Sequence, residues 1–212
     1  MMLMSTPLRP LGPLRELRGR SLSLRRLFQS DAEQLFDKYF NAPDFRNRYR
    51  PHDSSSSLET TRMILKDHHS EMANSGSPTF EYGYFNGDEM CGLLTISDID
   101  THALNAEILF GIFKKNNRGL RPSVGEAILL GLDLAFNHIQ LHRLYAHIFN
   151  DNIVAHRSIT HCGFKHEGSM REHALIEGTY KDIEIYACLK SDLQSNNNIL
   201  RHQKKLLGYE AF

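Results

Sequence analysis

The sequence predicts one α/β domain in which helices flank a mixed β-sheet, and three observations favour this class. The chain has 212 residues, which suits one domain of ordinary size better than two. Hydrophobic residues make up 41% of it, which is enough to bury a single sizeable core. Segments with strand and helix periodicity alternate along the chain, without an internal repeat or a recognisable linker.

The first half of the chain is expected to contain a strand and two helices. Alternating apolar and polar residues predict a strand over Ser21–Phe28. Ser30 can cap a helix that follows this strand and is closed by the segment ending at Pro43. A second amphipathic helix is expected at Leu58–Asn74, after a short polar loop.

Three strands are expected in the middle of the chain. Thr79–Phe85 and Met90–Ser97 are joined by Asn86–Asp88, a strong signal for a hairpin turn. Asn105–Phe113 is mostly apolar, as is typical of a central strand. A three-stranded meander is therefore predicted.

The remaining elements are expected in the order helix, strand, helix and two strands. They are placed at Val124–Asn137, at Leu144–Phe149, from Asn152 to Cys162, from Phe164 onward and at Tyr180–Leu189. Ser123 can cap the first of these helices, and Glu126 at its third position would complete a capping box. Gly163 is expected to end the second helix.

The charge balance restricts the partners that we expect. The chain carries 25 basic and 25 acidic side chains, so its formal net charge is zero. Such a chain has no global field that would attract nucleic acid or an anionic membrane. No apolar run approaches the roughly 18–20 residues that span a bilayer. We therefore expect neither nucleic acid nor a membrane as a partner.

The cysteines and the N-terminus bear on the compartment. Cys91, Cys162 and Cys188 are odd in number and show no CxxC spacing, so neither a disulfide framework nor a metal site is indicated. Cys162 is expected to be a small buried hydrophobic residue. Because the scattered cysteines indicate no disulfides, we expect a cytoplasmic location, where thiols stay reduced. Prolines interrupt the apolar residues of Met1–Arg20, unlike a secretory signal, although this Arg-rich start also has the composition of an organelle transit peptide.

Short segments of the second half carry a resemblance to a known family. They are Leu134–Phe136 (LAF), Leu141–Ala146 (LHRLYA), Asn150–Asn152 (NDN) and Cys162–Phe164 (CGF). In sequence and spacing this ordered set resembles the GNAT superfamily of N-acetyltransferases. Residues 167–172 and Asp182–Tyr186 further resemble its branch of ribosomal-protein N-terminal acetyltransferases. The resemblance covers about residues 18 to 193.

The resemblance implies a fold and an activity. The fold has a central mixed, mostly antiparallel, twisted sheet that is flanked by helices and splays between two central strands. The activity is transfer of an acetyl group from acetyl-CoA to a primary amine by direct attack in a ternary complex. Because a thioester is already activated, the protein mainly has to place the amine and remove a proton.

The resemblance also implies roles for particular residues. Glu107, on the expected central strand, would take the proton of the amine through water; the alternative is an ion-paired or solvent-facing strand residue. The loop from Arg118 to Gly125 would hold the pyrophosphate at a helix N-terminus, and the alternative is a simple surface loop. Asn152 could contact the cofactor or cap the helix that follows it. The residues assigned to acetyl-CoA are Gly111, Ile112, Phe113, Arg118, Gly119, Leu120, Arg121, Ser123, Val124, Gly125 and Asn152.

The chain departs from the family pattern in two places. Pro122 or Leu120 stands where the central glycine of the loop is expected, and a proline has no N–H to offer a phosphate. Arg118 and Arg121 could compensate through their charge. After Asn152, relatives often place a serine and sometimes a tyrosine that protonates the thiolate, and here these positions are Ala155 and Ile159. The general acid is therefore unassigned.

The acceptor remains open at the level of the sequence. A protein or peptide N-terminus leads on resemblance, with a nucleotide-linked amino sugar, a polyamine or an antibiotic as alternatives. The altered loop also motivates a protein that binds acyl-CoA without catalysis. We expect a monomer or a homodimer, with an N-terminal extension at 1–17, one domain at 18–193 and a C-terminal tail at 194–212. The end of this tail (LRHQKKLLGY) is weakly helical and basic, and its composition favours a solvated tail over a helix that binds a partner.

Overall fold

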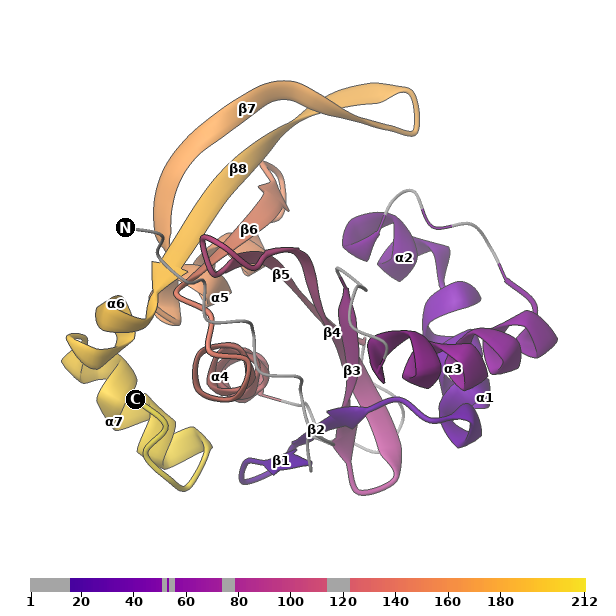
Figure 1. Ribbon diagram of the computed structural model, residues 1–212. Helices are drawn as coiled ribbons and strands as arrows, with labels where there is room; N and C mark the ends of the chain where they lie inside the picture. Colours follow the sequence, from indigo (N-terminus) through magenta and orange to yellow (C-terminus); the bar gives the residue numbers. More distant parts are fainter. Residues whose placement is uncertain (1–15, 51–52, 54–55, 74–78, 114–122) are drawn as a thin grey trace, which may run out of the picture.

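The strands of this protein form a single sheet, seen in Figure 1. The computed structural model describes residues 16–50, 53, 56–73, 79–113 and 123–212, with the backbone alone for 67–73. The sheet has eight strands in the order β1-β2-β3-β4-β5-β6-β8-β7. The strands are β1 Leu17–Arg18, β2 Ser23–Arg26, β3 Phe80–Asn86, β4 Glu89–Asp100, β5 Asn105–Ile112, β6 Arg143–Phe149, β7 Lys165–Ile176 and β8 Thr179–Leu189. Among these strands, β5 and β6 pair in parallel and all other neighbours are antiparallel, which confirms the predicted mixed, mostly antiparallel sheet.

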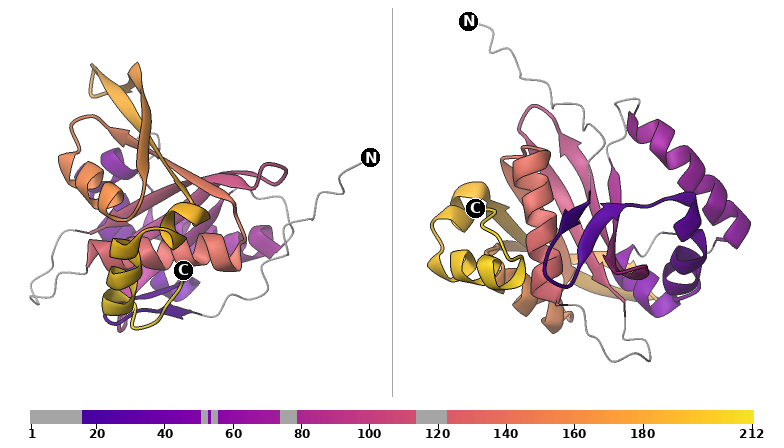
Figure 2. Two further views of the ribbon diagram at one scale, coloured as in Figure 1. Left: turned by 90° about the vertical axis from the view of Figure 1, so that its left-hand side faces the viewer. Right: turned by 90° about the horizontal axis from the view of Figure 1, so that it is seen from below.

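Helices cover both faces of the sheet (Figures 1 and 2). Helices α1 to α3 lie on one face, and α4 with α5 lies on the other. The helical segments are η1 Gln29–Asp31, α1 Ala32–Leu35, η2 Phe36–Phe40, α2 Pro43–Tyr49, α3 Leu58–Ala73, α4 Val124–Asp133, η3 Leu134–His138, α5 Ile153–His161, α6 Lys190–Gln194 and α7 Asn197–Leu206. Each face buries its own cluster of apolar side chains, as expected where helices pack on both sides of a sheet.

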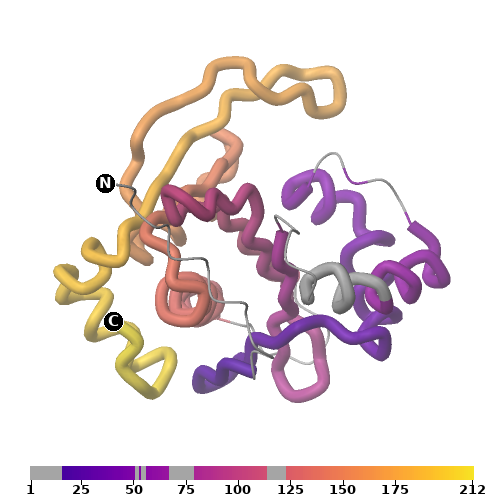
Figure 3. The backbone as a smooth tube through the Cα atoms, in the orientation of Figure 1, coloured from indigo at the N-terminus to yellow at the C-terminus, as the bar shows by residue number. Residues whose placement is uncertain are grey.

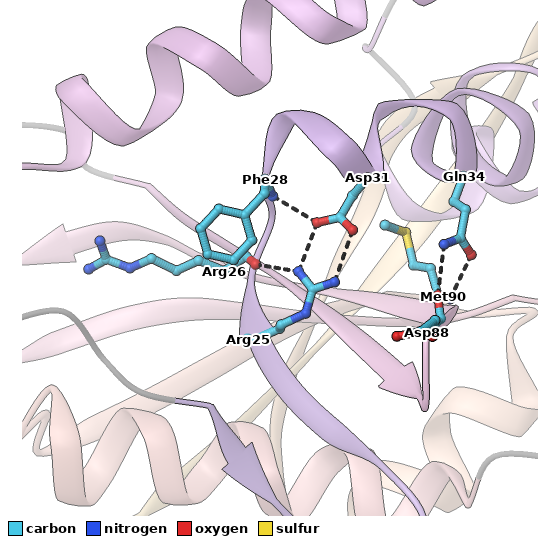
Figure 4. Close-up of polar contacts among 7 residues, drawn as sticks. All are labelled: Arg25, Arg26, Phe28, Asp31, Gln34, Asp88 and Met90. Carbon is cyan, nitrogen blue, oxygen red and sulfur yellow. Dashed lines mark hydrogen bonds and ion pairs between the residues drawn. The ribbon is translucent and has the colours of Figure 1, made fainter.

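Polar contacts fix the first helical segment to the sheet (Figure 4). Arg25 of β2 donates to both carboxylate oxygens of Asp31, at 2.8 and 2.9 Å. Gln34 of α1 donates to the carbonyl of Asp88 and accepts from the N–H of Met90, both at 2.8 Å. These bonds join the helices of one face to β2 and to the β3–β4 turn.

Helix α2 departs from the sequence prediction. Pro43 was expected to close the preceding helix, and no element was predicted directly after it. The first helical segment does end before Pro43, but this proline is also the first residue of α2. Proline suits that position because the missing N–H would have no partner inside the helix. Tyr49 at the other end of α2 is buried, and its hydroxyl lies 3.0 Å from that of Thr95 on β4.

The predicted meander is confirmed by β3, β4 and β5. Gly87 in the β3–β4 turn has a φ of 58°, a left-handed conformation that glycine adopts without strain. Strand β4 is longer than expected because it continues past Ser97 through an irregular pairing with β5 that extends to Asp100. Within this irregularity Asp98 has a φ of 51°.

Helix α4 is confirmed, but its capping differs from the prediction. Ser123 caps it, and its hydroxyl accepts from the N–H of Glu126 at 3.2 Å. The carboxylate of Glu126 does not turn back to Ser123 as a capping box requires. It accepts instead from the N–H groups of Ser21 and Leu22, at 2.7 and 3.0 Å, and from the Ser21 hydroxyl. The carboxylate therefore binds donors of the β1–β2 turn in place of the backbone N–H of Ser123.

The C-terminal residues correct a second expectation. The predicted solvated tail is wrong for the segment after Ser195, because α7 packs on the same core as α4. Ile199, Gln203 and Leu207 follow at helical spacing and are buried. The side chain of Gln203 also accepts from the N–H groups of the last two residues at 2.9 and 3.0 Å. The division of the chain at 193 and 194 stays a prediction.

Strands β7 and β8 form a long hairpin at the edge of the sheet, and its tip extends beyond the residues that pair with β6. Figure 3 shows it as an arm that curves over toward α2. At its tip, Glu177 lies 3.4 Å from the side-chain amide of Asn47 in α2. We call β7 and β8 the arm below. It reaches across the face of the sheet on which α2 lies.

Candidate active site

The two central strands separate shortly after they pair. Strands β5 and β6 are paired at Asn105–Arg143, Ala106–Leu144 and Glu107–Tyr145. Beyond Glu107, β5 continues to Ile112 and β6 to Phe149 without pairing with each other. The backbone groups of β5 that point toward β6 therefore have no partner on that strand and can bind a ligand. This is the splay that the resemblance implies.

A cavity of about 1670 Å³ occupies the region of the splay. Its walls come from the ends of β5 and β6, the first turns of α4 and α5, the segment from Ala42 to Tyr49 and the β3–β4 turn. A pocket for one small ligand usually measures about 300–1,000 Å³. The cavity therefore has room for two ligands side by side.

Several residues assigned to the cofactor line this cavity. Gly111, Ile112 and Phe113 from β5 line it, together with Val124 of α4 and Asn152. Ser123 and Gly125 flank Val124 at the start of α4. Arg118, Gly119, Leu120 and Arg121 lie outside the described residues, and so does Pro122. The effect of the altered loop on phosphate binding stays a prediction.

The N-terminus of α4 offers backbone donors to the cavity. The N–H groups of the first turn of a helix have no partner inside the helix, and they favour negative charge. Ser123 satisfies the N–H of Glu126, which leaves those of Val124 and Gly125 for a ligand. Ala127 and Ile128 line the cavity from the next turn. This helix end is suited to bind a phosphate.

Asn152 acts as a helix cap in the structure. Its side-chain oxygen accepts from the N–H of Ala155 at 3.2 Å, which caps α5. The structural alternative of the sequence prediction is thus confirmed, and contact with a cofactor stays a prediction. Ala155 and Ile159 also line the cavity, and neither side chain can donate a proton. The structure brings both positions to the site without an acid on them.

Gly111 is placed where β5 passes under α2. A Cβ atom at this position would lie 2.5 Å from the ring of Phe45 and 2.7 Å from the ring of Tyr49. The two rings stack on each other, with centroids 5.5 Å apart. Phe45 and Tyr49 both line the cavity. A glycine here lets two aromatic side chains approach the strand and form one wall of the cavity.

Glu107 lies at the last pair of residues before the splay, and its carboxylate has a partner. The Oε1 atom of Glu107 is 2.8 Å from Nδ1 of His147 on β6. The Glu107 side chain is 16% exposed and that of His147 is 33% exposed. The hydrogen bond to Glu107 raises the pKa of His147, desolvation lowers it, and the charges of Glu107 and Asp98 raise it further. The carboxylate that is otherwise costly to bury is therefore paired.

His147, Tyr145 and Asp98 were missed at the level of the sequence. The ring of Tyr145 meets that of His147 edge to face, with centroids 5.5 Å apart. Burial and the charges of Asp98 and Glu107 raise the pKa of Tyr145. A signal was present, because Arg143, Tyr145 and His147 alternate with apolar residues and must share one face of their strand. Only the pairing of β6 with β5 shows that this face carries Glu107.

Cys91, Cys162 and Cys188 are free thiols. Cys162 is buried, as predicted, and desolvation raises its pKa to about 12. Within the described ranges, no three His, Cys, Asp or Glu side chains cluster closely enough to hold a metal ion. None of the described helices has the length and hydropathy to cross a membrane.

Comparison with family models gives one match over most of the chain. Residues 21–165 match a family described as acetyltransferase (GNAT) domain. A curated relative, the probable N-acetyltransferase YjcK of Bacillus subtilis, is 24% identical over 180 residues, which are 83% of this chain and 98% of the relative. A spermidine N(1)-acetyltransferase of Vibrio cholerae is 35% identical over 60 residues, which are 28% of this chain and 35% of that protein.

Solved structures share the fold. RimJ of Mycobacterium smegmatis, in complex with CoA-disulfide, aligns with a TM-score of 0.73 and 22% identity over 94% of this chain and 98% of its own. Spermidine N-acetyltransferase of Vibrio cholerae, in complex with CoA and spermine, aligns with a TM-score of 0.69 and 21% identity over 82% of this chain and 99% of its own. At these identities, the likeness establishes a common fold.

Proposed function

The chain belongs to the GNAT family of acetyl-CoA-dependent N-acetyltransferases, and on this premise we propose that it acetylates a primary amine within a ternary complex. The amine nitrogen attacks the thioester carbonyl directly, the C–S bond breaks, and CoA leaves as the thiol after proton transfer. The observation that carries the proposal is the cavity of about 1670 Å³ at the splay, which exceeds the space that one ligand needs. Donor and acceptor can occupy it together.

The donor is proposed to lie along β5 and to end at α4. The two amide groups of its pantetheine arm can bond the backbone groups that β5 leaves free beyond Glu107. The N–H groups of Val124 and Gly125 can bind the pyrophosphate. Backbone N–H groups of β5 can also stabilise the negative charge that develops on the thioester oxygen. Acetyl-CoA is thus held mainly through the backbone, which tolerates a changed loop sequence.

The acceptor is proposed to enter from the face that carries α2 and the arm. Phe45 and Tyr49 form an aromatic wall there, and the Glu107–His147 pair lies on the same face at the start of the splay. A pair of this kind can remove the proton of the attacking amine. We propose a protein or peptide N-terminus as the leading acceptor, in line with the resemblance to ribosomal-protein acetyltransferases and the fold shared with RimJ.

A polyamine is the acceptor to test beside it. The segment that is 35% identical to a spermidine N(1)-acetyltransferase favours this class. The decisive experiment measures release of free CoA thiol from acetyl-CoA with three acceptor classes: short peptides with free N-termini, spermidine and an amino sugar. Identical peptides with a blocked N-terminus and no lysine are the matched control. Turnover with free but not blocked peptides supports the leading acceptor, and turnover with spermidine alone overturns it.

A second candidate function is binding of acyl-CoA without catalysis. Ala155 and Ile159 favour it, because the cavity lacks an acid at both positions. Calorimetric titration with acetyl-CoA separates the two functions when it is combined with the thiol assay. Stoichiometric binding without turnover of any amine supports the non-catalytic function. We place the protein in the cytoplasm, where its three free thiols would stay reduced.

A further inference from the structure

His147 lines the cavity, and its side chain contacts that of Glu107. The two side chains come from neighbouring strands and are joined by the 2.8 Å contact between Nδ1 and Oε1. Of this pair, His147 is among the described residues that line the cavity, and Glu107 is not. Of the two residues, His147 is therefore the one that an acceptor in the cavity can contact.

The contact with Glu107 determines which nitrogen of His147 can accept a proton. An ionised carboxylate only accepts hydrogen bonds, so Nδ1 must carry the hydrogen. In a neutral imidazole the other nitrogen, Nε2, then holds the free lone pair. The carboxylate also stabilises the imidazolium that forms when Nε2 takes a proton. One hydrogen bond thus orients the ring, selects its tautomer and strengthens it as a base.

The acidic groups around His147 also raise its pKa. Glu107 on β5 and Asp98 at the irregular end of β4 are the acidic groups that act on it, and both raise its pKa. Tyr145 on its own strand packs against the ring edge to face. On the other side, Ile185 of β8 is paired with His147 and carries no charge. Partial desolvation opposes these effects by lowering the pKa.

We propose that His147 is the general base of the acetyl transfer and that Glu107 is a positioning residue that acts through it. This inference rests on the proposed function. As the amine nitrogen forms its bond with the thioester carbon, its proton passes to Nε2 of His147, directly or through one water. The C–S bond breaks, and the imidazolium returns the proton through solvent to the CoA thiolate. Glu107 does not take the proton in this mechanism, unlike in the expectation from the sequence.

The test compares the pH dependence of kcat/KM for the wild type and two variants, with an acceptor found in the panel. In His147→Gln the amide can still donate to Glu107 but cannot take up the proton. We expect kcat/KM to fall about 10²–10⁴-fold, the usual contribution of a general base, and the loss of activity toward low pH to disappear from the profile. In Glu107→Gln the base remains, so this loss should persist but move to lower pH, because the charge that raises the His147 pKa is gone.

A matched control comes from a second histidine–carboxylate pair. Nε2 of His166 lies 2.6 Å from Glu184, and neither residue is among the described residues of the cavity wall. His166→Gln should leave kcat/KM and its pH profile unchanged. All variants should bind acetyl-CoA as the wild type does, which separates a catalytic effect from misfolding.

Two results would overturn the assignment. If His147→Gln keeps the pH profile while Glu107→Gln loses it, then Glu107 is the base. If both variants keep the profile and lose activity equally, the pair has a structural role. The histidine resonances provide a readout without turnover: the pKa of His147 should drop in Glu107→Gln. If the wild type binds acetyl-CoA and acetylates no amine, the proposed function itself fails and the inference falls with it.

Discussion

At the scale of single residues, the shape of the candidate active site depends on Gly111. Gly111→Ala would place a methyl group 2.5 Å from the ring of Phe45. Overpacking of this kind costs about 1–3 kcal/mol, so we expect a lower denaturation midpoint in urea and weaker binding of ligands. The matched control is Gly168→Ala on β7, where an added Cβ meets no atom within 4 Å. Equal midpoints for the two variants would mean that the rings of α2 move aside freely.

The pair of Glu107 and His147 also makes a pH-dependent contribution to stability. The pKa of His147 is raised in the folded state, so the pair stabilises the fold fully at a pH below the unfolded value of about 6.5. This contribution is lost as the pH rises through the folded pKa. Because His147 is partly exposed, we expect less than about 1 kcal/mol. Urea unfolding of wild type and His147→Gln should differ more at pH 6 than at pH 9, and a constant difference would contradict the pairing.

Glu107 could be predicted from the sequence more readily than His147. Glu107 is conspicuous because a lone carboxylate in an apolar strand requires a reason. His147 belongs to a strand in which every second residue is polar, and nothing local distinguishes it from Tyr145 or Arg143. Its role depends on a parallel pairing between segments about 40 positions apart, and periodicity does not reveal which strands are neighbours.

At the scale of elements, the buried carboxylate of Glu126 joins α4 to the β1–β2 turn. Glu126→Met keeps a side chain of similar length but removes the oxygen that accepts from the N–H groups of Ser21 and Leu22. Leaving such buried donors unsatisfied costs about 1–3 kcal/mol. The midpoint of urea unfolding should fall accordingly. Glu210→Gln, at an exposed ion pair with Lys204, is the control and should change the free energy of unfolding by less than about 0.5 kcal/mol.

Helix α7 gives a second prediction at this scale. Ile199 is buried, and its side chain lies with that of Leu193 against Gly163, so Ile199→Ala should cost about 2–5 kcal/mol of unfolding free energy. Arg201→Ala on the exposed face of the same helix is the control and should have little effect. If thermal unfolding shows no difference between the two, then α7 is the solvated tail that its composition suggests. The composition is misleading because the polar residues of α7 outnumber its apolar ones while the apolar ones share one face.

Two of the elements that differ from prediction, α2 and α7, do so for related reasons. Pro43 carries a signal for both the end of one helix and the start of the next, and the sequence alone does not decide between them. For α7, the helical spacing was visible, but its docking partner lies on α4, more than 60 residues earlier. Strong local signals, such as those of the β3–β4 turn and of the start of α4 at Val124, were read correctly.

At the scale of the whole molecule, the sheet has two parts, β1 to β5 and β6 to β8. They are joined by three parallel residue pairs between β5 and β6. A ligand that bonds both sides of the splay stabilises the folded state by mass action. At one hundred times its dissociation constant, acetyl-CoA should add about 2.7 kcal/mol and raise the melting temperature by several degrees. Scanning calorimetry over a series of cofactor concentrations measures this. If the melting temperature does not move over this series, then acetyl-CoA does not bind the folded protein at these concentrations.

The splay between β5 and β6 was predicted from the family resemblance and not from the pattern of residues. Alternation and apolar runs locate strands along the chain. The order of the strands in the sheet and the parallel pairing of β5 with β6 depend instead on how the connecting helices pack on the sheet. The ordered motifs after Leu134 supplied that information through the family. The described structure then shows the mixed sheet with the expected partners in the centre.

The arm leaves β7 as a long free edge of the sheet, whereas the opposite edge, β1, has two residues. Exposed edges invite other chains to add a strand, and a protein with no net charge has little overall repulsion to prevent aggregation. Charged and histidine side chains crowd this edge at 165–167 and 171–173, and the pairing with β8 is interrupted beside both groups. The colloidal stability of the protein near neutral pH therefore depends on a few local charges along one strand.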